Sequence, residues 1–206
     1  MSKVLKQFIL ATFNRHKTRE IHKILKVKLR CLADFYPPLK IIENGKTFEE
    51  NAIKKARAAA QKYKMPALAD DSGLMVDCLG GEPGVKSARY AGPHPTKEKL
   101  CRKLLREIHK AKGRELFAVC RKPSAKFVCC VAVVWPDGRE KICRGEVKGY
   151  IINEVRGQNG FGYDPVFIPR GYKKTFAQMR SSFKNKISHR ARALRKIKKL
   201  INGDKI

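Results

Sequence analysis

Acidic residues are scarce in this sequence. The chain has 18 Asp and Glu against 47 Lys and Arg, a formal net charge of +29 over 206 residues. Residues 170–206 are the extreme, with 13 Lys and Arg and one acid, Asp204. Such an excess permits a nucleic acid or another polyanion as partner. The alternative is that these side chains only fill solvated faces.

Paired cysteines and long apolar runs are also lacking. The seven cysteines are an odd number, none forms Cys-x-x-Cys, and the adjacent Cys129 and Cys130 lie in an apolar run where a thiol packs as a small hydrophobe. We expect a reducing compartment, no disulfide framework and no thiolate zinc site. The apolar run in the N-terminal segment is too short for the core of a signal peptide. No run approaches the ~20 residues of a membrane helix, so a cytoplasmic protein without a membrane partner is expected.

The hydrophobic patterns predict an α/β protein with a mixed sheet flanked by helices, in a single domain over residues 1–206. Strands and helices alternate in the first half, and the second half contains a hairpin with a Pro-Asp-Gly turn. The predicted strands are 4–12, 65–70, 126–135, the return strand of the hairpin from 139, and 163–168. The predicted helices are 15–32, 47–62, one beginning near Thr96, and 184–202.

Two of the few acids stand side by side in "LADDSGL" (68–74), at what is predicted to be a strand end. Successive strand side chains point to opposite faces, so only one of Asp70 and Asp71 can aim directly into a given pocket. The other aspartate would orient the first one or form a hydrogen bond. Mg²⁺ takes one or two carboxylates plus phosphates and waters, so an aspartate here together with Glu43 would suffice. The competing interpretation is a helix N-cap.

Three further polar segments follow predicted strands or begin predicted helices, where α/β proteins build ligand sites. "ATFNRHK" (11–17) could bind phosphate at a helix N-terminus, or be an ordinary capped turn. "GQNGFGYDP" (157–165) could hold a flat base against aromatic rings, or pack those rings into the core. "KNKISHRARAL" (184–194) could add a second wall, or be a solvated basic helix.

These segments together resemble the motifs of the inosine/xanthosine triphosphate pyrophosphatases, over residues 8–194. The pattern Thr-x-Asn-x-x-Lys appears in "ATFNRHK". The central motif resembles "TFEENAIKKARAAA" followed by "PALADDSGLMVDCLGGEPGVKSARYAG". The last two motifs resemble "GFGYDPVF" and "KNKISHRARAL". Four motifs in order make a chance match very improbable.

The resemblance implies a long central mixed sheet in two lobes with the active-site cleft between them, and a homodimer. It also implies Mg²⁺-dependent cleavage of dITP, ITP and XTP to the monophosphate and pyrophosphate, which keeps these bases out of DNA and RNA. Asp71 would be the general base and, with Glu43, a metal ligand. The implied triphosphate contacts are Thr12, Asn14, Lys17 and Ser72. The implied base-pocket residues are Phe161, Gly162, Tyr163, Asp164, Lys184, His189 and Arg190.

Two features depart from the family pattern. Phe13 stands where relatives often have glycine, and the charge of +29 is more basic than the family leads us to expect. Two alternatives therefore stay open. One is a nucleic-acid-binding protein that uses the basic C-terminal helix, and the other is a nucleotide pyrophosphatase with a different base preference.

Overall fold

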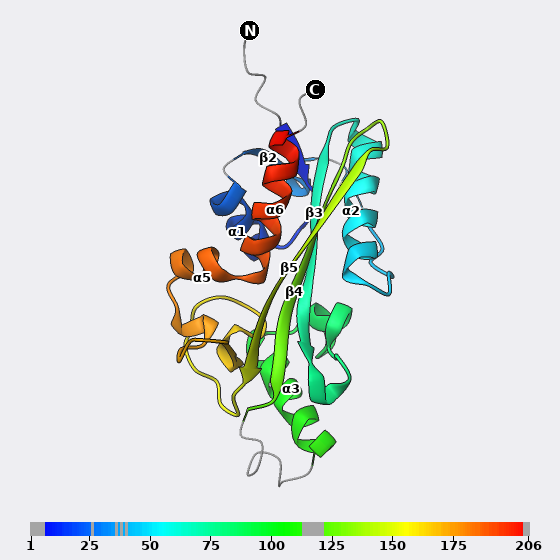
Figure 1. The fold of residues 1–206 in the computed structure, drawn as a ribbon. Coiled ribbons are helices and arrows are strands. Elements are labelled where there is room, and N and C mark those ends of the chain that lie inside the picture. The colour runs from blue at the N-terminus through cyan, green and yellow to red at the C-terminus, as the bar shows by residue number, and fades with distance from the viewer. Residues whose placement is uncertain are drawn as a thin grey trace. The chain divides into compact units, whose positions relative to one another are not determined.

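The structure, a computed structural model, describes residues 7–25, 27–35, 37, 39, 41–112 and 122–203. Within these residues the chain has an α/β fold around a sheet in the order β2-β1-β3-β4-β5-β6 (Figure 1). The strands are β1 (Gln7–Leu10), β2 (Lys28–Cys31), β3 (Ala67–Val76), β4 (Ser124–Val134), β5 (Glu140–Ile151) and β6 (Phe167–Pro169). β1 pairs in parallel with β2 and β3, whereas β5 and β6 are antiparallel, so the predicted mixed sheet is confirmed.

Five α-helices accompany the sheet in the described part of the chain. They are α1 (Arg15–Leu25), α2 (Phe48–Tyr63), α3 (Lys97–Lys112), α5 (Ser181–Ile187) and α6 (His189–Gly203). The predicted start of α2 at residue 47 is confirmed, because Thr47 caps the helix: its Oγ1 accepts a hydrogen bond from Glu50 N at 3.1 Å. Short 3₁₀ turns include η3 (Gly84–Arg89) and η4 (Asp164–Val166).

The chain divides into two compact units. Unit 1 is drawn from Met1–Asp71, Cys129–Gly145 and Arg190–Ile206, and unit 2 from Ser72–Val128 and Glu146–His189. Strands β3, β4 and β5 contribute residues to both units. The single domain and the cleft between two lobes stay predictions.

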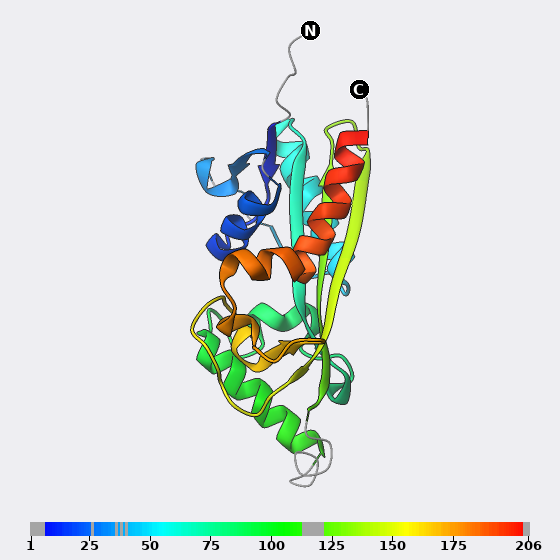
Figure 2. The same cartoon turned by 60° about the vertical axis from the view of Figure 1, so that its left-hand side comes forward.

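Each unit has a core of its own. In unit 1, α1 and α6 cover one face of the strands, and α2 lies on the other (Figures 1 and 2). The first face buries side chains from β1, β3 and β4 together with Ile21 of α1 and Leu194 of α6. In unit 2, Leu104 of α3 belongs to a cluster with Phe127, Phe167 and Phe176. Burial on alternate strand positions follows from the two-residue period of a strand.

Several predicted boundaries are wrong. The strand predicted over 163–168 begins only at Phe167, because Asp164–Val166 form a 3₁₀ turn. The helix predicted over 15–32 ends at Leu25, because Leu29 lies in β2, whose parallel pairing with β1 takes precedence over the helical spacing of the leucines. The strand predicted to end at Asp70 continues to Val76, so the two aspartates lie inside it. The helix predicted over 184–202 is interrupted at Ser188, which has extended backbone angles.

Two absences concern the described residues alone. None of the helices there is long and apolar enough to cross a lipid bilayer. The described cysteines carry free thiols, while Cys120 lies outside the described residues. The free cysteines are Cys31, Cys78, Cys101, Cys129, Cys130 and Cys143.

Candidate active site

The neighbouring aspartates of β3 contact different helices of unit 1. Asp70 contacts α1 and α6, through Lys17 Nζ at 3.3 Å and Arg190 Nη2 at 3.0 Å. Asp71 contacts α2, through Lys55 Nζ at 3.2 Å and Asn51 Nδ2 at 3.2 Å. Strand alternation therefore separates the two carboxylates onto the two covered faces of the sheet.

Asp70 belongs to a buried ionic network. Residues Asp70 and Arg190 are both 0% exposed, and Arg190 also pairs with Glu20. Burial alone would raise the pKa of the Asp70 carboxyl, but Lys17 and Arg190 outweigh it and hold that pKa well below its usual range. Asp70 is thus locked in the ionised form and ties β3 to α1 and α6.

Asp71 shares a lysine with Glu43. Lys55 Nζ lies 2.8 Å from Glu43 Oε2 and 3.2 Å from Asp71 Oδ1, so the two carboxylates converge on one cation. Burial raises the pKa of the Asp71 carboxyl above its usual value despite the attraction of Lys55 and Lys17. Burial disfavours the charge of Lys55, but Asp71 and Glu43 outweigh it and raise the pKa of the amine. A proton taken up at Asp71 is therefore less unfavourable than at Asp70.

Asn51 fixes this arrangement from α2. It is 1% exposed and its Nδ2 donates to Asp71 Oδ2 at 3.2 Å and to Gly45 O at 3.4 Å. Its Oδ1 accepts from Gly45 N at 2.8 Å. Because Gly45 follows Glu43 in the same loop, Asn51 links the loop of one carboxylate to the side chain of the other.

The predicted phosphate segment forms a capped turn at the start of α1. Asn14 Oδ1 accepts from the N–H groups of His16 and Lys17 at 3.0 and 3.2 Å, and Thr12 Oγ1 accepts from Asn14 N at 3.2 Å. Phe13 is 53% exposed. The structure therefore shows the capping function of these side chains, and phosphate binding by Thr12, Asn14 and Lys17 stays a prediction.

In unit 2, the predicted base-pocket segment is built around a buried ion pair. Lys184 Nζ lies 2.6 Å from Asp164 Oδ2, and the same oxygen accepts from Phe161 N at 2.9 Å. The Lys184 ammonium also lies 4.8 Å from the centre of the Phe161 ring. Gly162 has φ +61°, a conformation that L side chains rarely adopt. The turn that carries Phe161 is thus held by side chains and backbone together.

The remaining predicted residues of unit 2 occupy different environments. Tyr163 is buried and its hydroxyl donates to Ser87 O at 3.0 Å. The ring of His189, at the start of α6, stacks on Phe127 with centroids 4.8 Å apart. Ser72 is half-buried and directly follows Asp71 on β3. The contacts predicted for these residues with substrate stay predictions.

Prediction from the sequence missed Lys55 and Asn51. Both occupy the buried face of α2, at positions i and i+4, beside the buried Ala52 and Ala56. A buried lysine within a stripe of alanines is unusual, since Lys is almost never fully buried without a partner. The sequence alone does not show that Lys55 is buried, and its position becomes informative only once its partners Asp71 and Glu43 are known.

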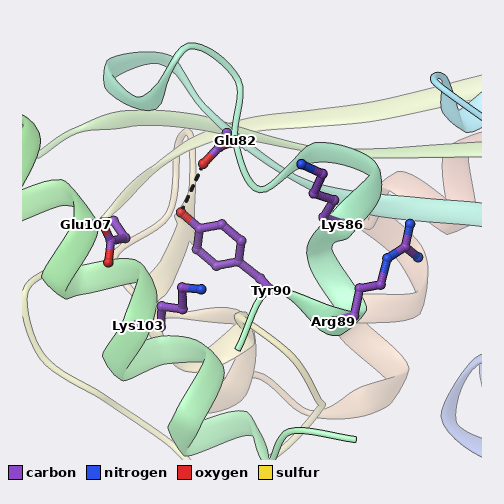
Figure 3. A pocket seen from close by; sticks show the side chains of 6 residues that line it. All are labelled: Glu82, Lys86, Arg89, Tyr90, Lys103 and Glu107. Atoms are coloured by element: carbon purple, nitrogen blue, oxygen red, sulfur yellow. Dashed lines mark hydrogen bonds between the residues drawn. The ribbon is translucent and has the colours of Figure 1, made fainter. Parts of the chain in front are cut away.

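A separate polar pocket of about 450 Å³ lies in unit 2 (Figure 3). Tyr90 occupies it with its hydroxyl 3.3 Å from Glu82 Oε2 and with Lys103 Nζ 4.7 Å from its ring centre. Burial and the Glu82 carboxylate raise the pKa of Tyr90 to about 12. Three cations and two glutamates line the pocket with Tyr90, a mixture typical of a surface ionic network. The lining residues are Glu82, Lys86, Arg89, Tyr90, Lys103 and Glu107.

The sheet and the carboxylates of unit 1 define an α/β protein in which Glu43 and Asp71 converge on one buried ammonium group. No group of three or more His, Cys, Asp or Glu side chains placed for a metal occurs among the described residues. A bound cation would therefore use two protein carboxylates and complete its coordination with substrate oxygens or water, as Mg²⁺ commonly does.

The model of the Ham1 family matches residues 8–200, and the chain belongs to that family. It is 45% identical over 203 residues to the dITP/XTP pyrophosphatase of Bacillus subtilis (strain 168), covering 97% of this chain and 99% of that protein. It is 44% identical over 209 residues to the dITP/XTP pyrophosphatase of Clostridium perfringens (strain 13 / Type A), covering 97% and 98%.

Solved structures of similar proteins have the same fold. The Ham1 protein of Staphylococcus aureus superposes with a TM-score of 0.83 at 37% identity, covering 97% of this chain and 100% of that chain. The nucleoside-triphosphatase / dITP/XTP pyrophosphatase of Mycobacterium abscessus gives a TM-score of 0.73 at 37% identity, covering 93% and 98%.

Proposed function

We propose that this chain hydrolyses the non-standard purine nucleotides dITP, ITP and XTP to the monophosphate and pyrophosphate, and so removes them from the nucleotide pool. It is a nucleoside triphosphate pyrophosphatase, in keeping with relatives of that name that match over nearly its whole length. The observation that carries the proposal is the convergence of Glu43 and Asp71 on a single buried ammonium group.

The two carboxylates fit Mg²⁺. Lys55 shows that both oxygens reach one point, and hard carboxylate oxygens are the ligands that Mg²⁺ prefers. When bound, the ion would neutralise charge on the phosphate oxygens and polarise the phosphorus that is attacked. Lys55 lies close enough to both acids to balance their charge before the substrate arrives.

Asp71 is the general base of the proposal. Its burial raises its pKa, which brings the carboxylate closer to the working pH, where a base transfers protons most effectively. It accepts the proton of the attacking water, while Asn51 holds the carboxylate in place. Thr12, Asn14, Lys17 and Ser72 contact the triphosphate in this scheme.

Base recognition is assigned to Phe161, Gly162, Tyr163, Asp164, Lys184, His189 and Arg190. Inosine and xanthosine carry an acceptor, the 6-keto oxygen, where adenine carries a 6-amino donor. Donors supplied by backbone N–H groups would be satisfied by the keto bases and left unpaired by adenine. The guanidinium of Arg190 contacts Asp70 and Glu20, so a contact between Arg190 and the base stays a prediction.

A homodimer, implied by the family resemblance, and a cytoplasmic location, expected from the sequence, belong to this proposal as further predictions. The alternative function, nucleic-acid binding through the C-terminal helix, accounts for the excess of positive charge. It gives no reason for Asp71 and Glu43 to share a buried lysine.

The test is a comparison of kcat/KM for ITP and ATP with Mg²⁺, measured by release of pyrophosphate. We expect ITP, dITP and XTP to be cleaved at least about 100-fold more efficiently than ATP, because a site built on hydrogen bonds rejects a mismatched ligand strongly. Equal values, or a preference for ATP, would overturn the assignment of the base while leaving the phosphate chemistry in place.

A further inference from the structure

A groove of about 500 Å³ on unit 2 carries an excess of positive charge, and its lining includes none of the predicted site residues. Among the described residues, four cations and one acid, Asp77, line it. We call it the cationic groove. Its lining consists of Asp77, Lys122, Ser124, Ala125, Lys126, Lys148, Gly149, Tyr150 and Arg170.

Three of the cations form a row across neighbouring strands. The backbone hydrogen bonds at the two ends of the β4–β5 hairpin agree on one register, which places Lys126 opposite Lys148. Arg170, just after β6, donates its N–H to Lys148 O at 2.9 Å, which places it opposite Lys148 on the other side. Neighbouring strands are about 4.8 Å apart, and like charges directly opposite one another destabilise a sheet.

This row is hard to explain by folding alone. Lys126 has a distant partner in Glu146, at 3.9 Å, where both side chains are about one-third exposed. Such a pair contributes little to stability. Lys148 and Arg170 are both exposed, and no ion pair to either is seen among the described residues. A row of repelling cations that lowers stability is expected where an anion binds.

Aromatic rings accompany the cations. Tyr150 lines the groove with Lys122 Nζ 4.8 Å from its ring centre, and its hydroxyl donates to Tyr172 O at 3.5 Å. The Tyr172 ring is itself exposed and packs edge-on against the exposed Phe183, with centroids 5.7 Å apart. Two more exposed cations, Lys173 and Lys174, follow Tyr172 in the chain.

We propose that the cationic groove binds single-stranded nucleic acid, with its cations on successive phosphates and bases stacked on the neighbouring rings. Cations that track a backbone, interleaved with aromatic rings, are what sequence-tolerant single-strand binding requires. The groove holds only a short length of one strand. This binding is additional to the nucleotide hydrolysis, because its residues are distinct from those assigned to that reaction.

The test is fluorescence anisotropy of a labelled 12-mer of deoxythymidine with the full chain, titrated at several salt concentrations. The groove variant carries Lys126→Gln, Lys148→Gln and Arg170→Gln. We expect its Kd to rise at least tenfold at about 100 mM salt. The slope of log K against log salt should fall by about 2, because each phosphate contact on a single strand contributes about 0.7.

The matched control carries Arg192→Gln, Arg195→Gln and Lys199→Gln, three exposed cations of α6. It loses the same charge, so we expect its Kd to change less than threefold. Equal weakening in both variants would mean that binding follows net charge alone, and the proposal would fall. It would also fall if the groove variant binds like the wild type, or if a 12-bp duplex binds as tightly as the single strand.

Two further measurements separate binding from folding and from catalysis. Tyr150→Leu keeps every charge and should weaken single-strand binding about fivefold by removing one stacking partner. Both triple variants should hydrolyse ITP within twofold of the wild type. The groove variant should unfold at a temperature no lower than the wild type, since it relieves repulsion. A large loss of stability would overturn the view that the row is retained for binding.

Discussion

Acidic residues of the predicted site are paired with lysines in both units, but in different ways. In unit 2, Asp164 and Lys184 have side chains 3% and 4% exposed and form a closed pair that fastens one turn. In unit 1, the buried Lys55 and Asp71 are joined to Glu43, whose side chain is 41% exposed. The unit 1 cluster therefore extends from the interior to the solvent, and that access is what a cation or a substrate needs.

A second contrast lies within unit 1. Asp70 and Asp71 are adjacent in the chain, yet their pKa values shift in opposite directions because their helices present different partners. Lys17 and Arg190 stabilise the charge of Asp70. Asp71 shares Lys55 with Glu43. We infer that Asp70 supports the fold and that Asp71 does the chemistry.

The largest expected effect is that of Asp71→Asn. The amide is nearly isosteric but cannot take a proton, so kcat for ITP should fall at least about 10³-fold, within the range attributed to general bases. Stability should be retained, because the ionised form is disfavoured at this buried position and Lys55 keeps Glu43. Steady-state kinetics and urea unfolding check both parts. A folded variant with wild-type turnover would show that Asp71 is not the base.

Asp70→Asn should act mainly on stability. It leaves Lys17 and Arg190 without the carboxylate between them, and breaking such a buried pair lowers the free energy of unfolding by about 3–5 kcal/mol. Urea unfolding at pH 7 measures this loss. If Asp70→Asn loses less stability than Asp71→Asn, the two roles are exchanged.

The same residue gives a pH dependence. The pKa of Asp70 is lower in the folded chain than in the unfolded chain, where it is about 3.9. The contribution of Asp70 to the free energy of unfolding is therefore present above the unfolded-state pKa and is lost as the pH falls below that pKa. Between pH 5 and pH 3 the unfolding free energy of the wild type should fall more steeply than that of Asp70→Asn. Parallel curves would contradict the assigned pKa shift.

Asp164→Asn should have the smallest effect of the three on kcat. The amide oxygen can still accept from Phe161 N and from Lys184, but the buried ammonium group loses its counter-charge, as in Asp70→Asn, at about 3–5 kcal/mol of unfolding free energy. We expect a several-fold rise in KM for ITP with kcat nearly unchanged, because the turn positions the base and not the water. A fall in kcat as large as that of Asp71→Asn would remove the distinction between the two regions.

Much of the fold followed from sequence patterns, since the Thr47 cap and the Pro-Asp-Gly turn fix local structure by themselves. The end of α1 could not be predicted, because Leu25, Leu29 and Leu32 fit a helical face equally well and only pairing with β1 decides. Glu43 was paired with one of the two aspartates from the residues themselves, and the family motifs pointed to Asp71; the structure brings both side chains to Lys55. Lys55 was missed, because its position on the buried face becomes informative only once the residues it meets on β3 are known.

The most direct test of the account is product identification by ³¹P NMR during ITP hydrolysis with Mg²⁺. A nucleoside triphosphate pyrophosphatase breaks the bond between the α- and β-phosphates, so inosine monophosphate and pyrophosphate should appear together in equal amounts from the start. Orthophosphate and inosine diphosphate as the first products would contradict the account.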